Sequence, residues 1–223
     1  MRSLVAEQYP HMAISGSDVV VTVGSQEAMT AAFLCIIEKG DDVLLPNPSF
    51  PAYDACVKIS EGSPVYYRLP ADKDFEFDIE EFKRAITPKT KAAVVISPSN
   101  PTGRILTESN LRQIAEVLNG TGIYLISDEI YGDLYFEGRP HSASEFYDRT
   151  IVVSGLSKSL SMTGWRLGWL ATTQKEITKA AIVLHGFLTV CTSTITQKAA
   201  LLGWTPEAEK SKAQAREIYK RRG

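Results

Sequence analysis

A single lysine stands among small hydroxyl residues in the stretch SGLSKSLSMTGWRLGW, residues 154–169. Lys158 follows the apolar run TIVVSG, and Arg166 comes eight positions later. A lysine sheltered by small neighbours at a strand end loses its proton more readily than one in water, and its amine can then act as a nucleophile. The arginine offers a planar fork for a phosphate. Taken alone, such a lysine and arginine are more often surface charges. Other residues are therefore needed to decide whether the two belong to a functional site.

Three more polar stretches follow apolar runs that predict strands. Gly24 precedes a helix expected to begin near Ser25, where free N–H groups would make an anion seat, although one glycine can simply turn the chain. Asn100 stands between two prolines in SPSNPTG. The prolines could hold its side-chain amide rigidly at the strand end, or the stretch could be an ordinary turn. Asp128 and Tyr131 follow IYLIS, where a carboxylate could pair with a buried cation and a phenol could donate to an oxyanion, or the two could merely cap and pack.

The elements that must position these residues alternate between strand and helix. Runs rich in valine and isoleucine predict strands at residues 18–23, 41–46, 64–69, 91–97, 123–127, 150–155 and 166–172. Helical patterns lie between them at residues 27–37, 53–60, 78–86 and 108–118, and from 174 onward. Asp78 with Glu81 predicts a capping box, and Thr205 with Pro206 predicts another helix start. Alternation of this kind predicts an α/β fold whose ligands bind beyond the carboxyl ends of the strands.

Composition narrows the classes of function. The chain has 223 residues, 44% of them hydrophobic and 22% charged, which is enough for a buried core. A formal net charge of −2 excludes a broad basic field for nucleic acid or an anionic membrane. Three separated cysteines without a CxxC pair predict neither disulfides nor a metal site. The polar start and the lack of an apolar run of about eighteen residues predict a soluble, cytoplasmic chain.

Taken together, the motifs resemble those of a known family. SxSNPTG, SDEIY and SKxxxMTGWRxGW occur in order between Val19 and Ala171. In this the chain resembles fold-type I pyridoxal-phosphate enzymes, in particular the class I/II aminotransferases. The resemblance implies a three-layer α/β sandwich around a mixed, mostly parallel sheet of about seven strands. It also implies a cofactor-binding large domain over residues 1–173, a helical extension over residues 174–223 and a homodimer.

The resemblance assigns chemical roles to the residues that match the family motifs. Lys158 would form the Schiff base with pyridoxal 5′-phosphate and, once displaced by substrate, would move the proton. Asp128 would keep the ring nitrogen protonated, while Asn100 and Tyr131 would hold the phenolate oxygen. Phe50, in PNPSFPAY, would stack on the cofactor ring. The other implied cofactor contacts form the phosphate site, namely Gly24, Ser25, Gln26, Arg166 and a hydroxyl from Ser154 or Ser157.

The sequence departs from the family pattern at both ends. Family members carry an N-terminal arm and a C-terminal small domain with an arginine for the substrate carboxylate, and these have no counterpart here. Arg216, Arg221 and Arg222 are expected to be solvated charges on a helix. A shortened aminotransferase acting on amino acids and 2-oxo acids is therefore expected. The alternatives are a C–S β-lyase or aminocyclopropane-carboxylate-synthase-like enzyme, and a non-catalytic cofactor-binding or assembly fragment.

Overall fold

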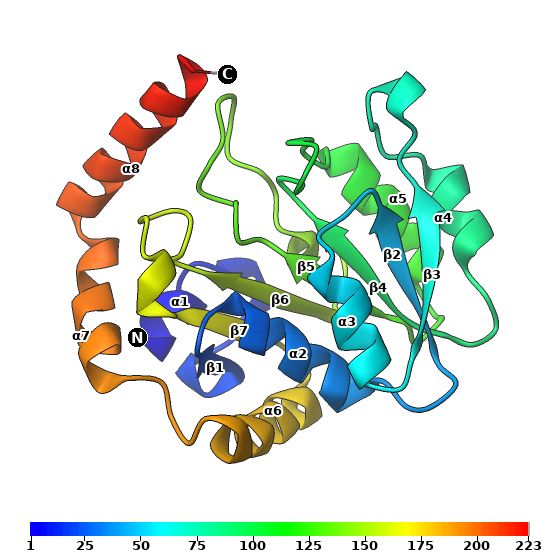
Figure 1. Ribbon diagram of the computed structural model, residues 1–223, viewed down its shortest axis with the longest axis horizontal. Coiled ribbons are helices and arrows are strands. Elements are labelled where there is room, and N and C mark those ends of the chain that lie inside the picture. The colour runs from blue at the N-terminus through cyan, green and yellow to red at the C-terminus, as the bar shows by residue number, and fades with distance from the viewer. Residues whose placement is uncertain (223) are drawn as a thin grey trace.

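The computed structural model describes residues 1–222, which form layers of helices around one seven-stranded sheet (Figure 1). Residue 223, the last of the expected helical extension, lies outside the described residues. Across the sheet the strand order is β1-β7-β6-β5-β4-β2-β3. The strands are β1 (Val19–Thr22), β2 (Asp42–Asn47), β3 (Ser63–Arg68), β4 (Thr90–Ile96), β5 (Tyr124–Asp128), β6 (Thr150–Gly155) and β7 (Gly168–Thr172).

The sheet is mixed but mostly parallel. Strands β3, β2, β4, β5 and β6 pair in parallel, whereas β7 pairs antiparallel with both β6 and β1. Six of the seven strands therefore point the same way, and their carboxyl ends meet at one edge. The expected α/β class and mostly parallel sheet are confirmed.

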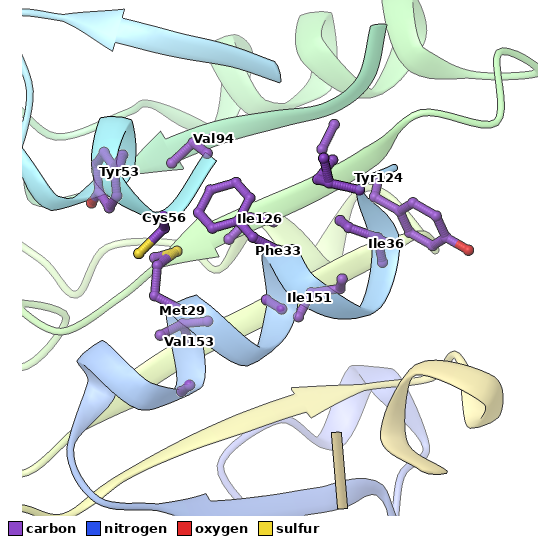
Figure 2. Close-up of a cluster of buried hydrophobic side chains, with 14 of the residues drawn as sticks. Met29, Phe33, Ile36, Tyr53, Cys56, Val94, Tyr124, Ile126, Ile151 and Val153 are labelled. Carbon is purple, nitrogen blue, oxygen red and sulfur yellow. The ribbon is translucent and has the colours of Figure 1, made fainter. Parts of the chain in front are cut away.

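Strict alternation along the strands separates two cores. Val43 and Leu45 face one side of the sheet, which is covered by α2 (Ser25–Ile36), α3 (Ala52–Ile59) and, over β1 and β7, α6 (Lys175–Leu188). Figure 2 shows part of this core, with Met29 and Phe33 of α2 beside Cys56 of α3. Leu44 faces the opposite side, which is covered by α4 (Ile79–Ala85) and α5 (Glu108–Leu118). On that side, α1 (Arg2–Ala6) and α7 (Thr194–Ala200) pack against β1 and β7.

Two helix starts were predicted from their capping residues, and one of them differs in a detail. Thr205 caps α8 (Pro206–Lys220) by accepting from the Ala208 N–H, as expected. Asp78 caps α4 by accepting from the Glu80 N–H, but Glu81 does not complete a capping box, because its carboxylate is paired with Arg84 one turn later. No helix within residues 1–222 is long and apolar enough to cross a membrane.

Candidate active site

A cavity of about 170 Å³ opens at the carboxyl edge of the parallel strands. Its walls come from segments that are far apart in the sequence but follow neighbouring strands, as expected for an α/β sheet. Most of the predicted site residues line it, namely Ser25, Gln26, Phe50, Asn100, Asp128, Tyr131, Ser157, Lys158 and Arg166. The fold therefore brings the separate motifs to one place.

Lys158 lies in a turn three residues after β6 ends. Its Nζ atom is 5.6 Å from the centre of the Tyr131 ring. Ser157 and Ser159 on either side are buried, so the backbone around the lysine is enclosed while its side chain reaches the cavity. An amine held in this way has room for a carbonyl group to approach it.

Asp128 is the last residue of β5, and its side chain is almost completely buried. One carboxylate oxygen, Oδ2, accepts a 2.7 Å hydrogen bond from the Tyr53 hydroxyl, and Oδ1 accepts a 3.1 Å bond from the Ile130 N–H. Burial raises the pKa of Asp128 to about 6, although both hydrogen bonds oppose that change. Both donors are neutral, so this carboxylate suits a cationic N–H group inside the cavity.

The first turn of helix α2 lies on the cavity wall, where Ser25 and Gln26 line it. Its N-cap is Gly24, at φ +82°, and no side chain caps the first turn. A Cβ at this glycine would collide with the Arg166 guanidinium, which also donates to the Thr163 carbonyl at 3.0 Å. A glycine is thus needed both for the backbone angle and for the close approach of the arginine. The uncapped helix start and the guanidinium together form a site for an anion such as phosphate.

Phe50 lies on the cavity wall and packs edge-on against Tyr53, with ring centres 5.8 Å apart and planes at 83°. The sequence reasoning named Phe50 but missed Tyr53, which stands three residues later in the first turn of α3. The available signal was the three-residue spacing of Phe50 and Tyr53 at the expected helix start, which brings two aromatic side chains close together. Recognising the contact with Asp128 also required knowing that α3 covers the end of β5.

Ser154 is the one predicted site residue that the fold directs elsewhere. Its hydroxyl donates to the Glu129 carbonyl at 3.0 Å, and it lines a second cavity, of about 240 Å³. Glu129 lines the same cavity and accepts hydrogen bonds from Ser127 and Ser142 at 2.9 and 2.6 Å. Burial raises the pKa of Glu129 to about 7. Of the two serines offered for the phosphate site, only Ser157 lines the first cavity.

Comparison with known sequences assigns the family. The profile described as aminotransferase class I and II matches residues 3–222, nearly the whole chain. The chain belongs to this family. Within it, the probable N-acetyl-LL-diaminopimelate aminotransferase of Bacillus subtilis is 39% identical over 208 residues, 92% of this chain and 52% of that protein. The aspartate aminotransferase of Geobacillus stearothermophilus is 36% identical over 211 residues, 92% of this chain and 53% of the relative.

Solved aminotransferase structures have the same fold. Aspartate aminotransferase from Thermus thermophilus with maleate superimposes with a TM-score of 0.94 at 35% identity, over 99% of this chain and 59% of that one. Aromatic aminotransferase from Pyrococcus horikoshii superimposes with a TM-score of 0.93 at 30% identity, over 99% of this chain and 61% of that one. This aminotransferase-family chain spans about half the length of the curated relatives it matches.

The arginines near the end of this aminotransferase-family chain make local contacts. Arg216 lies over the Tyr135 ring, 4.6 Å from its centre, and donates to the Asp133 carbonyl at 3.2 Å. Arg221 donates to the Glu217 carbonyl within its own helix, and Arg222 is exposed. None of the three lines the cavity that residues 1–222 form around Lys158.

Proposed function

We propose that this chain is the cofactor-binding part of an enzyme that transfers an amino group between an amino acid and a 2-oxo acid. The observation that carries the proposal is the convergence of Lys158, Asp128 and Arg166 on one cavity. An amine, a buried carboxylate and a cationic fork are what pyridoxal 5′-phosphate needs at its aldehyde, its ring nitrogen and its phosphate. Aminotransferases of this family depend on that cofactor.

The charges of the residues that line the cavity also match those of the cofactor. Asp128 is a desolvated carboxylate with only neutral donors, so a protonated ring nitrogen would stabilise its ionised form. The α2 N-terminus and Arg166 supply positive charge where a phosphate would lie. Asn100 and Tyr131 supply an amide and a phenol on the wall of the same cavity.

When bound, the cofactor supplies an electrophilic carbon for amines and a ring that withdraws electrons from the substrate Cα. Lys158 would hold the cofactor through Nζ and, once free, would accept and return the Cα proton at that atom. Asp128 would keep a proton on the ring nitrogen by accepting its hydrogen bond. Asn100 and Tyr131 would donate to the phenolate oxygen, and the Phe50 ring would stack on the cofactor ring and exclude water.

The remaining cofactor contacts proposed here are Gly24, Ser25, Gln26 and Ser157, with Arg166, around the phosphate. Residues 1–173 would form the cofactor-binding domain and the helices from residue 174 an extension of it. The proposed location is the cytoplasm, where the free thiols of Cys35, Cys56 and Cys191 would stay reduced.

A second copy of this chain is the proposed protein partner. Exposed apolar side chains gather between α6 and the 3-10 helix η6 (Leu201–Trp204), in the segment that Figure 1 shows at the outer edge of the molecule. Phe187 is 87% exposed, and Val190 and Ile195 are each 79% exposed. Apolar patches of this kind mark association surfaces, and a homodimer would cover this one.

Covalent trapping tests the proposal. The purified chain is mixed with pyridoxal 5′-phosphate, reduced with borohydride and mapped by tryptic digestion, and the label is expected on Lys158. Lys158→Ala should lose the label, whereas Lys39→Ala, at an exposed lysine away from the cavity, should keep it. A label on another lysine would overturn the assignment. Incubation with amino acid and 2-oxo acid pairs then distinguishes a transaminase, which forms a new amino acid, from a lyase, which releases ammonia.

A further inference from the structure

The hydrogen bond between Tyr53 and Asp128 joins two buried side chains from different elements, α3 and β5. We propose that Tyr53 is a positioning residue, which fixes the carboxylate of Asp128 in the orientation and ionisation state required by the cofactor ring nitrogen. The inference rests on the proposed function for the identity of the ligand. The contact itself belongs to the chain alone.

Tyr53 is placed so that its hydroxyl has little freedom. The residue is fully buried, and its ring packs in the same core as Phe33 and Cys56, at the end where Figure 2 shows its hydroxyl directed away from them. Phe50 abuts the ring edge-on from the cavity side. Burial, followed by the charge of Asp128, raises the pKa of Tyr53 well above its ordinary value, so the hydroxyl remains protonated and donates.

The two hydrogen bonds to Asp128 divide the work of orientation. The Ile130 N–H holds Oδ1 and belongs to the backbone just after β5, whereas the Tyr53 hydroxyl holds Oδ2 across the gap to α3. With both in place the carboxylate cannot rotate, and lone pairs remain on each oxygen for a donor in the cavity. Without the hydroxyl, Oδ2 would be buried with no donor of its own, and the carboxylate could turn.

Removal of the hydroxyl should also make Asp128 harder to ionise. The Tyr53 and Ile130 hydrogen bonds both lower the pKa of Asp128 against the effect of burial, and only the second would remain. The other titratable groups around this carboxylate are Glu129, next along the chain, and Tyr131, Lys158 and Arg166 on the cavity wall. These groups are unchanged by a substitution at Tyr53, so a change in Asp128 titration would report the lost hydrogen bond.

The test compares Tyr53→Phe with Tyr67→Phe. Tyr67 is a matched control because it is also buried and its hydroxyl donates a 2.8 Å hydrogen bond, but to the Val94 carbonyl on the other side of the sheet. In the cofactor-free chain, carbon-13 NMR of the Asp128 carboxyl should show its titration midpoint moved upward by about one pH unit in Tyr53→Phe only. The dissociation constant of pyridoxal 5′-phosphate should rise about ten-fold in Tyr53→Phe only.

A double-substitution cycle separates positioning from general packing. In an Asp128→Asn background, Tyr53→Phe should leave cofactor affinity nearly unchanged, because the carboxylate on which the hydroxyl acts is already gone. Equal effects of Tyr53→Phe in both backgrounds, or equal effects of Tyr53→Phe and Tyr67→Phe, would overturn the proposal. If the wild-type chain takes no cofactor on Lys158, the proposed function fails, and the NMR titration still decides whether Tyr53 controls Asp128.

Discussion

Replacing Asp128 by asparagine should make the cofactor-free chain more stable above pH 6. The pKa of the folded-state carboxyl is raised from 3.8 to about 6 by burial. Ionisation is therefore disfavoured in the folded state, and at 1.36 kcal/mol per pH unit the cost is about 3 kcal/mol. The sign follows from the raised value: this cost is absent below about pH 4, grows as the pH rises, and is complete above pH 6. Asparagine does not titrate and escapes it.

Urea unfolding at intervals from pH 4 to pH 8 measures this effect. The free energy of unfolding of Asp128→Asn minus that of wild type should be near zero at pH 4 and should rise by about 3 kcal/mol by pH 7. Asp72→Asn, at an exposed position, is the control and should give a small difference that does not follow this curve. A difference for Asp128→Asn that stays constant with pH would refute the reasoning.

The same substitution should weaken cofactor binding, because a cationic ring nitrogen loses its charged acceptor. Stability and function therefore move in opposite directions at this one residue. Titration of the variant with pyridoxal 5′-phosphate, followed by absorbance, gives the dissociation constant. An unchanged constant would show that Asp128 does not face the ring nitrogen.

Two further outcomes follow from the site and the surface. Gly24→Ala should lower the free energy of unfolding by about 1–3 kcal/mol, because its φ of +82° strains any side chain, and the new Cβ should displace Arg166. Cofactor affinity should fall with it, whereas Gly40→Ala, also at positive φ but with open space around it, should lose stability alone. Phe187→Glu should shift the chain toward monomer in light scattering, because a charge would enter the apolar patch. A dimer of unchanged strength would place the association surface elsewhere.

The sequence allowed the sheet to be predicted well because its strands are buried on both faces. Runs such as KAAVVIS and TIVVSG have an unbroken apolar centre, AAVVI and IVV, which is typical of a strand covered on both sides. Helix α5 was predicted at its observed bounds, since a threonine cap and a strong apolar stripe define it. Helix α1 was missed because it is only five residues long and has no side-chain cap, so it owes its existence to packing against β1.

The site was predictable to the extent that strand ends converge. Lys158 and Asn100 each follow a parallel strand and Asp128 ends one, so the α/β rule brings them to one edge without further information. Ser154 shows the limit of reasoning from motifs alone. In β6 it shares the face of Val152 and not that of Val153, and only Val153 lies on the side of the sheet that carries the cavity around Lys158. The period of two along a strand, counted from Val153, would have placed Ser154 on the opposite face.

At the end of β5, the alternation of side chains directs two adjacent carboxylates to opposite sides of the sheet. Asp128 lines the cavity around Lys158, whereas Glu129 lines the second cavity, where the Ser127 and Ser142 hydroxyls donate to it. The charge of Asp128 is one of the reasons why the pKa of Glu129 is raised. A cation paired with Asp128 would offset that charge and make Glu129 easier to ionise. The two cavities, which share Ile130 in their walls, are thus linked electrostatically across the edge of the sheet, through residues that are neighbours in the chain.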